Sequence, residues 1–167
     1  EKSNTFYNKD LNKIDKNFEV ITWDAKSADK GNFEHFMLKE IYEQPNSIRE
    51  TIGSRIVPNS KCDFSDISIT KEYLSGISRI YIVACGTAAY AGIATKSVFE
   101  RLTDVPVEVD IASEFRYREP LIDSHTLIIF ISQSGETADT IAALKNAKAN
   151  GSKTIAISNV LRKFYNS

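Results

Sequence analysis

The second half of the chain alternates between short apolar runs and longer segments of helical composition. Segments 88–102 and 137–150 read as helices, and Asn150-Gly151 is typical of the left-handed cap that ends a helix. Segment 112–120 is charged and aromatic, and we assign no element to it. Because strands and helices alternate, we expect the α/β class, with a parallel sheet and right-handed crossovers. The apolar runs that predict its strands are 79–84, 105–111, 126–131 and 153–158.

Two polar stretches lie in the first half of the chain. Residues 1–31 are rich in Lys, Asn and Asp, and only the run 18–23 has the composition of a strand. Segment 57–76 contains proline, asparagine and several serines, and it reads as loop with one short helix at 70–75. Because residues 1–31 can bury little apolar surface, we expect them to be a linker at the tail of a preceding domain.

Residues 32–56 between these stretches have a helical pattern that Pro45 interrupts. Proline fits the first turn of a helix and disrupts its interior, so we expect Pro45 to open a second helix. Ile48, Ile52 and Ile56 recur every four residues and should form one buried stripe on that helix.

Hydroxyl side chains gather where the third predicted strand ends. Ser132, Ser134 and Thr137 follow the apolar run, with Gly135 between them, and a helical segment begins there. The first amides of a helix lack internal partners and the helix dipole is positive at that end, so this stretch can cradle an anion such as phosphate. A plain helix cap by Ser134 or Thr137 is the alternative, although a cap needs only one hydroxyl.

A second loop, 85–89, leaves the carboxyl end of the first predicted strand. Ligands of open α/β sheets bind outside those ends, so we expect both loops to line one crevice. Gly86 lets the backbone approach a ligand closely, and Thr87 adds a hydroxyl at a helix start. The two loops together predict a site for a small phosphorylated ligand.

A dinucleotide site is the rival interpretation of this crevice. Asp110 lies near the end of the second predicted strand, where a ribose-binding acid is expected. However, the turn 85–90 reads Cys-Gly-Thr-Ala-Ala-Tyr and lacks the Gly-x-Gly-x-x-Gly pattern, and the sequence has no P-loop motif. The sequence therefore favours a smaller phosphorylated ligand.

Five other residues carry chemistry with a plainer alternative beside it. Cys85 is either a nucleophile activated by a helix N-terminus or a small apolar group. Glu114 and Glu136 are acid–base candidates or solvated carboxylates. Arg116 and Arg118 either steer an anion or make surface ion pairs.

Bulk composition narrows the functional classes. The chain has 167 residues, 42% of them hydrophobic, and a formal net charge of -1, so nothing favours nucleic acid or an anionic membrane as partner. No apolar run approaches the roughly 20 residues of a membrane span. The two cysteines lack Cys-x-x-Cys spacing, and His35 and His125 are far apart. We therefore expect no metal and a reduced, cytoplasmic protein.

Four stretches carry a resemblance to a known family. They are 35–45 (His-Phe-Met-Leu-Lys-Glu-Ile-Tyr-Glu-Gln-Pro), 84–87 (Ala-Cys-Gly-Thr), 112–118 (Ala-Ser-Glu-Phe-Arg-Tyr-Arg) and 132–140 (Ser-Gln-Ser-Gly-Glu-Thr-Ala-Asp-Thr). In order and spacing they resemble glucosamine-6-phosphate synthase, the isomerizing glutamine–fructose-6-phosphate aminotransferase family. The first of them is similar to the segment that joins the family's glutaminase half to its sugar-isomerase half.

The resemblance implies a first sugar-isomerase (SIS) domain with a flavodoxin-like, three-layer αβα fold. It implies that the site holds the phosphate of fructose 6-phosphate or glucosamine 6-phosphate, with Cys85 and Gly86 shaping it. Ala88 stands where the family often has serine, which removes one hydroxyl contact. The implied substrate-binding residues are Cys85, Gly86, Thr87, Ala88, Ser132, Gln133, Ser134 and Thr137.

The family enzyme uses ammonia from glutamine, acts as a homodimer or larger assembly and needs no redox cofactor. Its glutaminase nucleophile and its isomerase acid–base residues lie in domains that we do not recognise in this sequence. We therefore expect no catalytic residue here, little activity of the chain alone, and an open sheet edge that favours association. The expected parts are 1–31, glutaminase tail and linker; 32–76, helical lead-in; 77–160, incomplete first SIS domain; and 161–167, unaligned tail.

A non-catalytic regulatory module that binds a sugar phosphate is the alternative function, because SIS domains also serve in regulators. Such regulators place a DNA-binding segment before the domain. The linker-like residues 1–31 and the hinge-like segment 35–45 argue against this alternative.

Overall fold

The chain divides into two compact units, Glu1–Ser65 and Asp66–Ser167, and each is described by itself. The predicted boundaries of the four parts stay predictions, and the predicted strand 18–23 and the tail 161–167 lie outside the described residues. The structure is a computed structural model, and it describes residues 5–15, 29–53, 55–57, 61–65 and 67–160.

The first unit contains two short antiparallel strand pairs and one helix. β1 pairs with β2, and β3 pairs with β4. The stretch predicted as linker therefore carries a small hairpin near its start. The bounds of the elements are β1 (Phe6–Tyr7), β2 (Lys13–Ile14), α1 (Phe36–Gly53), β3 (Ile56–Val57) and β4 (Lys61–Cys62).

Helix α1 differs from the prediction in two respects. It runs unbroken through Pro45, so the prediction of a second helix is wrong. The fixed φ of proline is compatible with a helix, although the residue lacks the N–H for one helical hydrogen bond and crowds the preceding turn. The expected buried stripe is also wrong, since Ile48 and Ile52 are 56% and 45% exposed and Ile56 lies in β3. Periodicity predicts which face is apolar, whereas burial requires a covering element, and no residue of α1 is buried.

The second unit is built on a four-stranded parallel sheet, as predicted, with the order β6-β5-β7-β8. β6 begins two residues later than expected, because Pro106 has no N–H for the ladder, although its carbonyl accepts the N–H of Ile80 at 2.9 Å. The strands are β5 (Arg79–Ala84), β6 (Val107–Ile111), β7 (Thr126–Ile131) and β8 (Lys153–Ile157).

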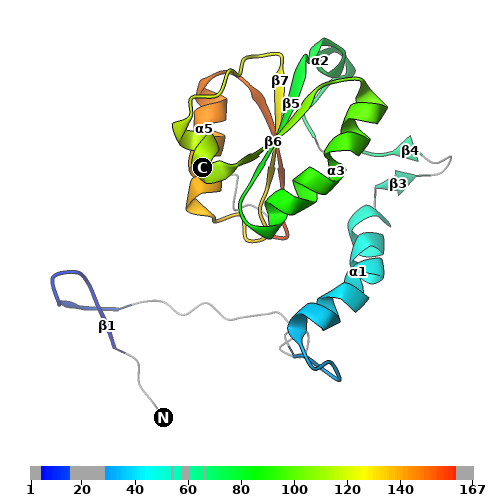
Figure 1. Cartoon of the computed structure of the whole chain (residues 1–167). Helices are drawn as coiled ribbons and strands as arrows, with labels where there is room; N and C mark the ends of the chain where they lie inside the picture. The colour runs from blue at the N-terminus through cyan, green and yellow to red at the C-terminus, as the bar shows by residue number, and fades with distance from the viewer. Residues whose placement is uncertain (1–4, 16–28, 54, 58–60, 66, 161–167) are drawn as a thin grey trace. The chain divides into compact units, whose positions relative to one another are not determined.

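Helices cover both faces of this sheet, which gives the expected three-layer αβα arrangement (Figure 1). One core cluster joins strand residues such as Val83 and Phe130 to Leu144 of α5. The other joins Ile82 to Phe99 of α3 and to Tyr73 of α2, on the opposite face. The helices are α2 (Lys71–Gly76), α3 (Thr87–Thr103), α4 (Ala112–Tyr117) and α5 (Ala138–Ala149).

Helix α4 lies in the segment to which the sequence assigned no element. Its Phe115 is fully buried and meets the rings of Tyr81 and Phe130 edge-on, with centroid distances of 5.6 and 6.4 Å. Aromatic pairs of this geometry add about 0.5–1.5 kcal/mol each beyond their buried area. One aromatic anchor thus holds a helix too short to show a periodic pattern.

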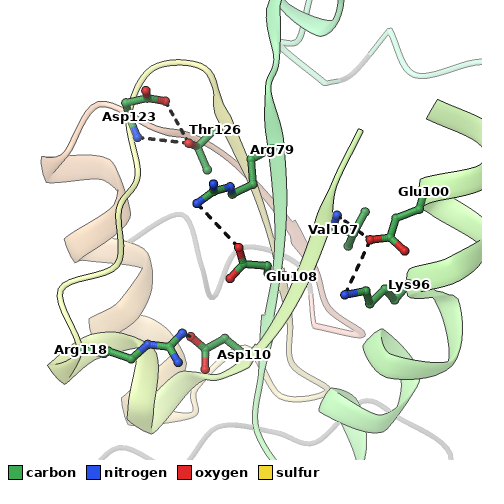
Figure 2. A network of polar contacts seen from close by, with 9 residues as sticks. All are labelled: Arg79, Lys96, Glu100, Val107, Glu108, Asp110, Arg118, Asp123 and Thr126. Atoms are coloured by element: carbon green, nitrogen blue, oxygen red, sulfur yellow. Dashed lines mark hydrogen bonds and ion pairs between the residues drawn. The ribbon is translucent and has the colours of Figure 1, made fainter. Parts of the chain in front are cut away.

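Ion pairs join strand residues to their neighbours in the second unit (Figure 2). Arg118, which follows α4, pairs with the buried Asp110 of β6. Arg79 of β5 pairs with Glu108 of β6 at 3.7 Å. At the beginning of the sheet, Tyr73 of α2 donates its hydroxyl to the carbonyl of Thr126 at 3.1 Å, so α2 belongs to this unit.

Gly92 lets α3 lie close to the sheet, and we predict that Gly92→Ala destabilises the second unit. A Cβ there would lie 2.8 Å from Ile82 Cγ2 and 3.2 Å from Val109 Cγ1. We expect urea denaturation to show a loss of about 1–3 kcal/mol in the free energy of unfolding. Gly76→Ala in α2 is the control, because a Cβ there meets nothing within 4 Å. Equal losses in both variants would contradict the packing argument.

Asp123 closes the turn before β7. Its carboxylate accepts the hydroxyl of Thr126 at 3.0 Å (Figure 2). It also accepts the N–H of His125 at 2.9 Å, and the two bonds lower the pKa of Asp123. With a lowered pKa, its contribution to stability is present above about pH 4 and is lost as the pH falls through the folded-state value. We predict that Asp123→Asn flattens the acid limb of urea midpoint against pH. An unchanged acid limb would count against this role.

Candidate functional site

The carboxyl ends of β5 and β7 lie side by side. Ala84 pairs with Ile131 in the parallel register, so the loops that begin at Cys85 and Ser132 leave the sheet next to each other. The chain crosses from β5 outward to β6 and returns past β5 to β7, which makes this the point where the strand order reverses. Open α/β sheets bind ligands at such switch points. The structure thus brings together the two loops that the sequence singled out.

The loop 132–137 is held in shape by its own hydroxyls. Ser132 is buried, and its Oγ accepts the N–H of Gly135 at 3.1 Å and lies 3.2 Å from Thr137 Oγ1. Gly135 has a φ of 68°, in the left-handed region that favours glycine. Ser134 Oγ accepts the N–H of Glu136 at 3.2 Å. These hydrogen bonds between residues close in sequence fix the backbone conformation of the turn that precedes α5.

Neither α3 nor α5 has a side-chain cap at this edge. Thr137 is the N-cap residue of α5, yet its hydroxyl makes no cap bond and contacts Ser132 instead. Gly86 is the N-cap residue of α3, with a φ of 57° and no side chain to offer. A plain cap by Thr137 is therefore not what the structure shows. The first-turn amides of both helices lack the bonds that a capping side chain provides, although the N–H of Ala89 donates to the main-chain carbonyl of Gly86 at 3.1 Å.

A pocket of about 190 Å³ opens between the two loops. Among the residues that the structure describes, the lining contains no charged side chain, and its polarity comes from hydroxyls, one amide and the helix starts. Gly86 is not part of the lining, but it is the N-cap residue of α3. Ile131 also lines the pocket, which the sequence analysis did not predict, because the last residue of an apolar run has no distinguishing pattern. The lining residues are Cys85, Thr87, Ala88, Ile131, Ser132, Gln133, Ser134 and Thr137.

Of three weaker candidates, one lines the pocket and two lie outside its lining. Cys85 lines the pocket, and its half-buried thiol accepts the hydroxyl of Thr140 at 3.9 Å. Glu114 and Glu136 are exposed and lie outside the lining.

The remaining charged candidates form ion pairs. Asp110, the acid of the rival dinucleotide site, is bound by Arg118, so its carboxylate is not offered to a ribose. Arg116 Nη1 lies 2.8 Å from Asp139 Oδ1. In their direct contacts, both arginines therefore make ion pairs, the plainer of the two interpretations that the sequence left open.

Within the part of the chain that the structure describes, no group of three or more His, Cys, Asp or Glu side chains is placed to hold a metal ion. Among the same residues, no helix is both long enough and apolar enough to cross a bilayer.

Comparison with known proteins places this geometry in a family. A family model described as the SIS domain matches residues 73–163, more than half of the chain. The chain belongs to the SIS domain family. Both pocket loops and all four strands of the sheet lie inside the matched segment. The expected fold class is confirmed.

Curated relatives extend this match beyond the SIS domain. The chain is 57% identical over 156 residues to the isomerizing glutamine–fructose-6-phosphate aminotransferase of Clostridium acetobutylicum, covering 93% of this chain and 26% of that protein. The corresponding enzyme of Caldanaerobacter subterraneus is 55% identical over 149 residues, with 89% and 24% covered. The SIS domain chain is thus a homologue of these aminotransferases, which confirms the resemblance, and it spans about a quarter of their length.

A solved structure agrees with this relationship. The C-terminal domain of glucosamine-fructose-6-phosphate aminotransferase from Francisella tularensis superposes with a TM-score of 0.71 at 38% identity. The superposition covers 81% of this chain and 38% of that chain. The sheet and its flanking helices are therefore those of a sugar-isomerase domain.

Ser132 supports the loop from within, and we predict that Ser132→Ala destabilises the second unit. The substitution leaves the N–H of Gly135 without its acceptor and removes the contact with Thr137. We expect urea denaturation to show a loss of about 1–2 kcal/mol in the free energy of unfolding. Ser134→Ala is the matched control, because its hydroxyl bonds the exposed Glu136, and its loss should be smaller. The reverse order would contradict this account of the loop.

Proposed function

We propose that the pocket binds the phosphate of a hexose 6-phosphate, either fructose 6-phosphate or glucosamine 6-phosphate. The observation that carries this proposal is that two helix starts without side-chain caps and the hydroxyls of four residues converge on one small pocket. Backbone amides at helix N-termini hold phosphate even where no cationic side chain is present. Homology to aminotransferases named for fructose 6-phosphate supports the sugar. The four residues are Thr87, Ser132, Ser134 and Thr137.

The lining residues take different roles in this proposal. Thr87, Ser134 and Thr137 donate hydroxyls to phosphate oxygens, beside the first amides of α3 and α5. Ser132 is buried and stabilises the loop. Gln133 has an exposed side-chain amide that can contact the ligand, while its main-chain carbonyl accepts the N–H of Asn159 at 3.2 Å. The residues that shape the cavity through small size or backbone conformation are Cys85, Gly86 and Ala88.

We also propose that the chain acts within the isomerase half of an enzyme that makes D-glucosamine 6-phosphate from fructose 6-phosphate and L-glutamine. The lining residues that the structure describes include no carboxylate, imidazole or amine, which are common groups for transferring protons. Binding and proton transfer are therefore assigned to different parts of that enzyme. The proposed setting is the cytoplasm, with a glutaminase domain, a second SIS domain and a second copy as partners, and no redox cofactor.

Binding of fructose 6-phosphate should depend on Thr137. We predict that Thr137→Ala weakens binding about tenfold, or about 1.4 kcal/mol, because it removes a hydrogen bond to a charged oxygen. Isothermal titration calorimetry of the whole chain measures this. Thr95→Ala is the control, since the hydroxyl of Thr95 bonds the carbonyl of Ala91 at 2.9 Å farther along α3.

Fructose without its phosphate is the control ligand for the same titration. It should not bind measurably, because the proposal assigns the pocket to the phosphate. Binding of fructose as tight as that of fructose 6-phosphate would contradict the proposal, as would equal affinity of Thr137→Ala and the unaltered chain.

A further inference from the structure

An ion pair joins α4 to the beginning of α5. Arg116 lies in the last turn of α4 and Asp139 in the first turn of α5, and Arg116 Nη1 is 2.8 Å from Asp139 Oδ1. Their side chains are 33% and 39% exposed, so the pair is partly shielded from solvent. Neither residue lines the pocket.

Asp139 nevertheless lies in the first turn of α5, the helix whose N-cap residue Thr137 lines the pocket. It follows the pocket residue Thr137 by two positions, which is a rise of about 3 Å along a helix. The next residue, Thr140, bonds the thiol of Cys85, which belongs to the other loop of the pocket. The carboxylate of Asp139 is thus held on the same helical turn that would receive the ligand.

A carboxylate at this position has two opposite effects. It stabilises α5 through the helix dipole, because the N-terminal turn carries partial positive charge. It also competes with a bound phosphate for that same charge and repels the ligand dianion. Since the described part of the pocket lining holds no cation, an uncompensated Asp139 would weaken phosphate binding.

We propose that Arg116 is a positioning residue of the phosphate site, which neutralises Asp139 so that the first turn of α5 accommodates its own carboxylate and a phosphate together. This inference rests on the proposed function of the pocket. The same ion pair ties the first turn of α5 to α4, and α4 is anchored in the core by Phe115. Arg116 acts through Asp139 and does not itself contact the ligand.

Titration of the whole chain with fructose 6-phosphate at low ionic strength tests this role. Arg116→Met should weaken binding about three- to tenfold, because it leaves the charge of Asp139 uncompensated in the first turn of the helix that would hold the phosphate. Asp139→Asn should bind at least as tightly as the unaltered chain. Combining Arg116→Met with Asp139→Asn should restore most of the affinity.

Salt provides a readout that a purely structural role would not change. The Debye length falls from about 30 Å at 0.01 M to about 8 Å at 0.15 M, so added salt should shrink the defect of Arg116→Met. Lys96→Met is the matched control, because it removes an ion pair with Glu100 on α3, at 3.7 Å, away from the pocket (Figure 2). It should leave the affinity unchanged.

The possible outcomes separate the inference from the proposed function. If the unaltered chain fails to bind fructose 6-phosphate, the proposed function falls and this inference with it. If the chain binds but Arg116→Met binds equally well, only the inference is overturned. A combined variant as weak as Arg116→Met would also overturn it, since Arg116 would then act by packing alone. Should Arg116→Met not fold, weakened binding by Asp139→Asn would overturn the inference independently.

Discussion

The parallel pairing of β5 with β7 is the constraint on which the rest of the second unit depends. Its register sets Ala84 beside Ile131, and the two loops that follow therefore meet at one edge. The pairing also gives the sheet its reversal of strand order, because β6 lies on the other side of β5. Without this pairing, the hydroxyl-rich turn and the glycine-containing turn would be separate loops, each too small to enclose a ligand.

Rigidity and binding capacity are divided among the hydroxyls of the site. The hydroxyl oxygen of Ser132 accepts the N–H of Gly135 and contacts the hydroxyl of Thr137, and these contacts fix the conformation of the loop. No side chain caps the N-terminus of α3 or α5, and residues at both N-termini line the pocket. The partial positive charge of each helix N-terminus therefore lies at the pocket. An anion site built in this manner needs no lysine or arginine in its lining. If the pocket binds phosphate as proposed, charges just outside it, such as those of Arg116 and Asp139, should change the affinity.

Helix α4 connects the core to the site. Phe115 packs edge-on between Tyr81 and Phe130, while the neighbouring Arg116 reaches the first turn of α5. Through these contacts, the short helix α4 links the buried strands of the sheet to the first turn of α5, the helix that would hold the phosphate. Gly92 has the corresponding effect on the opposite face, where the absence of a side chain sets how near α3 approaches the sheet.

The amino-acid sequence alone determined the four strands, the helices α3 and α5 and the two loops of the site, because these depend on contiguous runs and local turn chemistry. The resemblance added the family and the hexose phosphate. Tertiary structure decided what local pattern does not contain: the strand order, the exposed stripe of α1 with its internal Pro45, and the helix α4. It also decided that Ile131 lines the pocket and that Arg116 meets Asp139. These features arise from contacts between residues distant in the chain, and no local periodicity records them.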